Sequence, residues 1–215
     1  MTNTAQAQNP TMLDPRPAFS TAVQLGRQVV AGVRPEQFAL RTPCSDFDVH
    51  TLAAHLVAVL QRVAVVGRGE DPFIAPHFVT GIADADLLAA YDAFAAEAAT
   101  VWADDAVLTN LLTLPWAKLP GAISLMIYVS EVSVHTWDLA VATGQTVAWD
   151  DSVLQIAYNA ISRGLPTEGR MEHYDAAAAA AAGNAGVIAP FSAVVPTADD
   201  APLIDKLVAW TGRQP

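Results

Sequence analysis

The sequence predicts an all-α protein, an antiparallel four-helix bundle with a short C-terminal extension. Apolar residues recur at helical spacing in four long segments, and Gly-, Pro- or Asp-containing connections separate these segments. Apolar residues make up 53% of the 215 residues and charged residues 15%, which is enough for one hydrophobic core. We therefore expect a flexible tail over residues 1–13, a helical bundle over 14–165, and an extension over 166–215 that packs on the bundle.

The first two helices are predicted from their apolar spacing and their ends. Residues 16–32 carry Phe19, Val23, Leu25 and Val29 at helical intervals, with prolines near the start. A second helix is predicted over residues 46–66. It starts at a possible capping box, in which Ser45 is the cap and Asp48 lies three residues further on. This second helix presents an apolar stripe made of Leu52, Leu56, Val59 and Val63.

The remaining helices are predicted in the same way. Residues 84–103 form a third helix, and a fourth runs from about Pro120 to Thr143, where Gly144 suits the position after a helix end. The segment between them contains β-favouring residues and two prolines, which indicates an extended connection. A shorter fifth helix begins at Asp150 or Asp151 and ends near Gly164.

The pattern weakens in the C-terminal extension. Residues 176–182 are an unbroken alanine run, which is low-complexity sequence. Residues 191–202 are predicted to be extended, and the last fourteen residues contain a short terminal helix.

Charge and composition exclude several function classes. The net charge is 11 − 22 = −11, and such a surface repels the phosphates of nucleic acids and anionic lipids. No uninterrupted apolar run reaches the roughly 18 residues of a membrane-spanning helix. Cys44 is the only cysteine, and the first thirteen residues carry no Lys or Arg. We therefore expect a cytoplasmic protein without internal disulfides that binds neither nucleic acid nor membrane.

Three ionisable residues stand close together on the fourth helix. Glu131, His135 and Asp138 fall within a sector of roughly 60° on a helix with about 100° per residue. They could form an ordinary wet face. However, the rest of this helix is apolar nearly all round, and no Lys or Arg accompanies the triplet. The i, i+4 spacing lets Glu131 and His135 reach one cation, for which carboxylate and imidazole are standard ligands.

A third ligand must come from another helix, and His55 is the best candidate. It lies at the margin of the apolar stripe of the second helix, where a structural histidine is the alternative interpretation. His50 lies on the opposite, polar side, whereas His77 and His173 fall in predicted loops. The latter two are therefore outside candidates.

Four motifs resemble a known family: "TPCSDFDVHTLAAHLV", "LPGAISL", "EVSVHTWDLAVATGQ" and "DAPLIDKLVAWTGRQP". They are similar to the DinB-like superfamily, and more closely to the branch of mycothiol-dependent maleylpyruvate isomerases and an uncharacterised actinobacterial group. The resemblance covers about residues 16–165, and the tail resembles the uncharacterised group. It implies a bundle that binds one divalent metal through His55, Glu131 and His135. The isomerases carry a separate C-terminal domain where this chain has about fifty residues.

Three protein ligands leave a fourth metal position open, which is typical of catalytic zinc sites. Zinc is the expected ion, although nickel, iron and manganese suit the same donors. An open position can lower the pKa of bound water to about 7, or it can bind an external thiol as thiolate. The resemblance favours the thiol, with mycothiol as the cofactor. The alternative is a non-catalytic metal-binding or purely structural bundle.

Other residues near the predicted centre have two interpretations each. Asp138 could orient His135 through a hydrogen bond, or could be an exposed neighbour. Arg62 could bind the carboxylate of a substrate or cofactor, or could lie beside the core with its charge in solvent. Cys44 could be a nucleophile at a helix N-terminus or a small packing residue. Because apolar bundles of this kind often pair, a homodimer is one expectation for the assembly, with a small molecule as the ligand.

Overall fold

Helices dominate the computed structural model, which describes residues 13–170 and 191–215. The longer helices are α1 (Arg16–Ala31), α2 (Val49–Gly67), α3 (Leu87–Val101), α5 (Gly121–Thr143) and α6 (Asp151–Gly164). The shorter helices are α4 (Asp105–Thr109) and α8 (Leu203–Trp210), with 3₁₀ turns at Pro35–Gln37, Pro72–Ile74 and Asp84–Asp86. Strands β1 (Leu111–Thr113) and β2 (Lys118–Pro120) form one antiparallel hairpin. The all-α prediction is therefore confirmed for the described residues.

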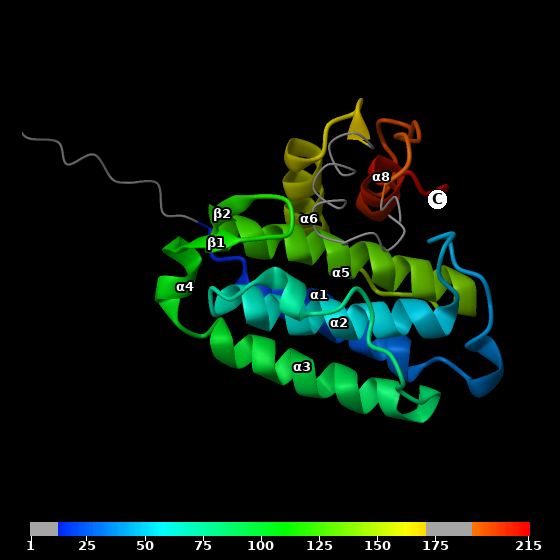
Figure 1. The fold of residues 1–215 in the computed structure, drawn as a ribbon. Helices are drawn as coiled ribbons and strands as arrows, with labels where there is room; N and C mark the ends of the chain where they lie inside the picture. Colours follow the sequence, from blue (N-terminus) through cyan, green and yellow to red (C-terminus); the bar gives the residue numbers. More distant parts are fainter. Residues whose placement is uncertain (1–12, 171–190) are drawn as a thin grey trace, which may run out of the picture.

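Helices α1, α2, α3 and α5 lie side by side (Figure 1). Helix α2 packs against both α3 and α5, and α1 packs against the same two helices. The predicted stripe of α2 is fully buried, since Leu52, Leu56, Val59 and Val63 have no exposed surface. Burial extends around the whole helix and includes His55 and Arg62, which are 4% and 8% exposed. Helix α2 is thus the central element of the core and carries polar side chains into it.

Helix α2 is long and apolar enough to cross a membrane by length and composition alone. Its most apolar window has a mean hydropathy of 1.6, although no uninterrupted apolar run in the sequence is that long. However, 83% of that window is buried inside the fold. Its hydropathy is therefore that of a helix packed on several sides by other helices.

Local sequence explains where the helices begin and end. The carboxylate of Asp48 accepts the backbone N–H of Thr51 at 2.8 Å, so Asp48 caps α2 and Ser45 lies outside the helix. Asp150 caps α6 in the same way. Gly144 adopts φ 68° directly after α5, as the sequence predicts, and glycine tolerates that left-handed conformation without strain.

The connection between α3 and α5 is more ordered than predicted. Asp104 caps the short helix α4 by accepting the backbone N–H of Ala106. The chain then turns back as a hairpin, in which Leu112 pairs with Leu119 and the side chain of Leu112 is buried. The β-favouring residues therefore do form extended backbone, but they pair with each other.

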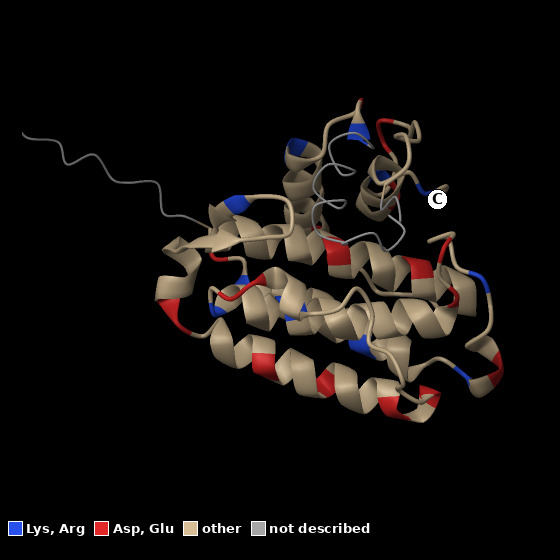
Figure 2. Ribbon diagram, viewed as in Figure 1, with Lys and Arg blue, Asp and Glu red and all other residues tan. Residues whose placement is uncertain are grey.

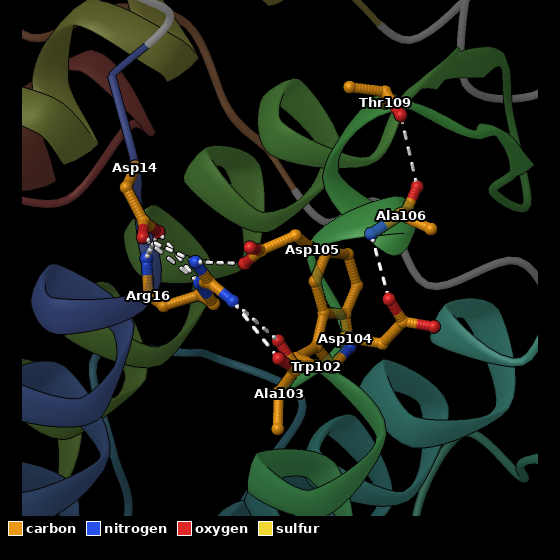
Figure 3. Close-up of polar contacts among 8 residues, drawn as sticks. All are labelled: Asp14, Arg16, Trp102, Ala103, Asp104, Asp105, Ala106 and Thr109. Atoms are coloured by element: carbon orange, nitrogen blue, oxygen red, sulfur yellow. Dashed lines mark hydrogen bonds and ion pairs between the residues drawn. The ribbon is translucent and has the colours of Figure 1, made fainter.

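Polar contacts of arginine and tryptophan hold the helices together at the end where α1 begins. Arg16 forms ion pairs with Asp14 and Asp105 and reaches the carbonyl oxygens of Trp102 and Ala103 (Figure 3). The indole N–H of the buried Trp102 also donates to the carbonyl of Val63 on α2. These contacts fix the start of α1 against the ends of α2 and α3.

The C-terminal residues lie against α5. Helix α6 packs on α5, and α8 packs on α6 and on α5 (Figure 1). Residues 191–202, predicted to be extended, contain no regular helix or strand and include bends and a turn. The alanine run at 176–182, His173 and nearly all of the tail at 1–13 lie outside the described residues. The division of the chain at residue 165 stays a prediction.

Candidate metal centre

The packing of α2 against α5 brings the three predicted ligands together. Ligand atoms of His55, Glu131 and His135 all lie within 4.8 Å of one another. The imidazole Nε2 of His55 is 3.6 Å from a carboxylate oxygen of Glu131, and the two imidazole centroids are 4.9 Å apart. His55 thus meets two residues that lie 76 and 80 positions further along the sequence, although the role of all three as ligands stays a prediction.

The imidazole of His55 is held in one orientation by the loop before α3. Its Nδ1 lies 2.6 Å from the backbone carbonyl oxygen of His77, so Nδ1 carries the proton and donates it there. The ring also packs against Phe47, with centroids 5.4 Å apart. Because Nδ1 is engaged by that carbonyl, Nε2 is the ring nitrogen that faces Glu131. A neutral imidazole with a free Nε2 is the form that binds a metal.

The imidazole of His135 has a similar arrangement on α5. Its Nδ1 lies 3.1 Å from a carboxylate oxygen of Asp138, one turn further along the helix. Burial lowers the pKa of His135, and the Asp138 carboxylate opposes that shift only in part. The ring is therefore neutral at physiological pH, and its Nε2 is available as a ligand.

The carboxylate of Glu131 is kept ionised by its surroundings. Burial raises its pKa, but contact with His55 and the positive charge of Arg62 outweigh burial and lower the pKa to about 2. The guanidinium Nη1 of Arg62 is 4.0 Å from Glu131, while Nη2 donates to the carbonyl of Pro76 at 2.7 Å. The side chain of Arg62 is 10% exposed, so its charge lies at the candidate centre and not in bulk solvent.

The charged stripe of α5 faces the interior of the protein. Glu131 and Asp138 are the only Asp, Glu, Lys or Arg residues of this helix, whose two acidic bands are visible in Figure 2. The side chains of Glu131, His135 and Asp138 are 21%, 14% and 0% exposed. The interpretation as an ordinary wet face is therefore wrong for this structure.

The structure adds a residue that the sequence interpretation missed. Arg213, near the C-terminus, forms two hydrogen bonds with the carboxylate of Asp138: Nη2 to Oδ2 at 2.9 Å and Nε to Oδ1 at 3.2 Å. Burial raises the pKa of Asp138, but contact with His135 and the charge of Arg213 outweigh it and lower that pKa. A buried aspartate implies a partner, but nothing in the sequence identifies one 75 positions away.

Cys44 lies next to this centre without joining it. Its sulfur is within 4.8 Å of ligand atoms of His135 and Asp138, which is a second geometric grouping. Both oxygens of Asp138 already accept hydrogen bonds from Arg213, so this carboxylate is a poor choice for a cation. Burial raises the pKa of the Cys44 thiol to about 11. Cys44 therefore stays protonated and packs against the core, as a small apolar residue would.

Two other histidines take no part in the grouping. His50 pairs with Asp84 on the partly exposed polar side of α2, as its position on the helix predicts. His77 contributes its backbone carbonyl, and its ring lies against His55 and Phe47. Desolvation against these neighbours, with the positive charges of the site, lowers the pKa of His77 to about 4.

The donor set fits one divalent cation. Two ligands at about 2.0–2.1 Å from a tetrahedral zinc ion lie about 3.3–3.4 Å apart. The three donor atoms already lie within 4.8 Å of one another, so shifts on the order of 1 Å would bring them to coordination distance from a single zinc ion. Two imidazoles and a carboxylate make a three-ligand set that leaves a fourth position for a small molecule.

Comparison with known proteins assigns the chain to a family. Residues 19–140 match the family described as "Mycothiol maleylpyruvate isomerase N-terminal domain", and this segment contains His55, Glu131 and His135. The chain belongs to this family. The match spans α1 to α5 and stops before α6, α8 and Arg213. The resemblance recognised in the sequence motifs is thereby confirmed.

Two curated relatives of the chain carry names that assign no function. They are "Uncharacterized protein MT0763" and "Uncharacterized protein Rv0738", from two strains of Mycobacterium tuberculosis. Each is 32% identical over 139 residues, which is 64% of this chain and 72% of the relative. No solved structure matches the chain significantly. Membership in the mycothiol maleylpyruvate isomerase N-terminal domain family, together with the donor grouping, allows a metal site.

Proposed function

We propose that this chain is a divalent-metal-dependent enzyme that activates a small thiol, such as mycothiol, or water, for transfer, isomerisation or hydrolysis of a small molecule. The observation that carries the proposal is the convergence of three donors from two helices, with both imidazole Nδ1 atoms already engaged elsewhere. The packing of α1, α2, α3 and α5 supports a DinB-like four-helix bundle as the scaffold.

Zinc is the proposed ion, with nickel, iron or manganese as competitors for the same donors. When bound, such an ion polarises an oxygen or sulfur ligand and favours its deprotonated, nucleophilic form. In this proposal His55, Glu131 and His135 hold the ion. Asp138 keeps the ring of His135 in the tautomer that presents Nε2.

In this proposal, Arg62 recognises the negative charge of a substrate or cofactor next to the ion. Its guanidinium lies at Glu131 and has five N–H donors, of which the hydrogen bond to Pro76 uses one. A substrate or cofactor carboxylate bound here would place its reacting group close to the open metal position. Arg62→Met should therefore raise the KM for an anionic substrate more than it changes metal content.

Calorimetry with mycothiol tests the thiol branch of the proposal. The zinc-loaded protein should bind mycothiol, whereas the protein stripped with a chelator and the His135→Ala variant should not. Equal binding to zinc-loaded and stripped protein would remove the thiol and leave water as the nucleophile. A screen of thiol-transfer and ester or amide substrates then tests turnover, and a loaded protein without any turnover would support the non-catalytic alternative.

The proposed cellular location and class of ligand follow from the composition of the chain. A lone cysteine and a net charge of −11 suit a reducing cytoplasm and a small-molecule ligand, rather than nucleic acid or membrane. A homodimer is the proposed assembly, and light scattering of the full chain tests it directly.

A further inference from the structure

We propose that Arg213 is a positioning residue for the metal centre, acting through Asp138 on His135. This role rests on the proposed function of His55, Glu131 and His135 as ligands. It goes beyond the family match, which ends at residue 140. It assigns the C-terminal segment a direct part in forming the site.

The contact between Arg213 and Asp138 is a buried, two-pronged ion pair. Two hydrogen bonds of 2.9 Å and 3.2 Å join the planar guanidinium to the carboxylate, which fixes the orientation of the two groups relative to each other. The side chains are 6% and 0% exposed. Oδ2 of Asp138 is shared between Arg213 and Nδ1 of His135, at 2.9 Å and 3.1 Å. Three side chains thus form one continuous polar chain that leads to the ligand.

The turn after α8 places the guanidinium there. Helix α8 packs on α5 and α6, and the backbone N–H of Arg213 donates to the carbonyl of Val208. Gly212 has φ 94°, and a Cβ at this residue would lie 2.6–2.9 Å from backbone and side-chain atoms of Ser192. Only glycine fits both the positive φ and this close approach. The chain therefore reverses at Gly212 and directs the next side chain toward α5.

Geometry explains why this pair matters for His135. The carboxylate of Asp138 has no exposed surface, and the guanidinium of Arg213 donates to both of its oxygens. Without the guanidinium, the carboxylate would be free to rotate, and its hold on Nδ1 of His135 would weaken. Carboxylates that accept from a metal-bound imidazole orient the ring and increase its basicity, and their loss typically lowers metal affinity by about 10- to 100-fold.

The decisive variant is Arg213→Met, which removes the charge and the two hydrogen bonds to Asp138 and puts an unbranched apolar side chain in their place. Zinc affinity of the full chain is measured by competition with a chromophoric chelator, at a temperature where circular dichroism shows the variant folded. We expect affinity to fall by about 10- to 100-fold. Arg163→Met, on the exposed last turn of α6, is the matched control and should leave affinity unchanged.

A double-mutant cycle separates this route from a general loss of packing. In the Asp138→Asn background, Arg213→Met should cause almost no further loss of zinc affinity, because the group through which it acts is already gone. Additive losses would overturn the role proposed for Arg213, and so would an unchanged affinity in the single variant. Should Arg213→Met not fold, Arg213→Lys tests the same point. It keeps the positive charge but cannot form the paired hydrogen bonds to Asp138, so we expect an intermediate loss of zinc affinity. Wild-type protein that binds no zinc at all would overturn the metal centre itself.

Discussion

Replacing Glu131 with glutamine in the metal-free protein tests how the centre is held before any ion binds. Burial raises the pKa of Glu131, yet contact with His55 and the charge of Arg62 lower it to about 2, against an ordinary value of 4.5. That difference corresponds to about 3 kcal/mol of unfolding free energy at neutral pH. Because the side chain is 21% exposed, solvent screening reduces the expected loss in Glu131→Gln to about 2 kcal/mol.

The pH dependence gives this prediction its sign. The pKa is lower in the folded protein than in the unfolded chain, so the stabilisation is fully present above about pH 4.5 and is lost as pH falls toward 2. Urea unfolding in the presence of a chelator, followed by circular dichroism from pH 7 to pH 3, measures the difference between wild type and variant. The exposed Glu168→Gln is the control and should match wild type throughout. A Glu131→Gln deficit that stays constant down to pH 3, or no deficit at pH 7, would refute the reasoning.

Three further outcomes follow from the same geometry. His77→Ala should keep zinc affinity within about threefold of wild type, because the backbone carbonyl and not the ring engages His55; a tenfold loss in a chelator competition would show that the ring takes part. Burial lowers the pKa of His135 below the ordinary 6.5, so this ligand should be lost to protonation only at a lower pH than a solvent-exposed histidine would be, and a pH titration of zinc binding checks this. Gly26→Ala should lower the unfolding free energy by about 1 kcal/mol or more, since a Cβ there would lie 2.6 Å from a buried tyrosine hydroxyl. Gly164→Ala, which has open space around it, is the control and should not destabilise the protein; thermal unfolding measures both variants.

Local patterns in the sequence were sufficient to predict most of the helices. The positions of α1, α5 and α6 follow from apolar spacing and from end signals such as Gly144, because those signals act within one or two turns. Helix α2 begins three residues later than the sequence predicts, since Ser45 and Asp48 both suit a cap and only the hydrogen bond to Thr51 decides between them. The hairpin was missed because pairing of β1 with β2 depends on the turn that joins them.

The candidate site was predictable in its ligand types but not in its support. His55, Glu131 and His135 carry sequence signals of spacing and unusual placement on apolar helices. The partners of the two imidazoles carry weaker signals or none. A backbone carbonyl at His77 is invisible to any residue pattern, and the pairing of Asp138 with Arg213 depends on how α8 packs against α5. Contacts of this kind are set by tertiary structure alone.

The metal content of the untagged protein tests the central claim most directly. Elemental analysis of wild type, His55→Ala and His135→Ala, purified side by side, should give one zinc or related ion per wild-type chain and none in either variant. Circular dichroism should show that both variants keep most of their helical signal. Full metal occupancy in both variants, or a wild-type protein that holds no ion even after zinc is supplied, would contradict the account.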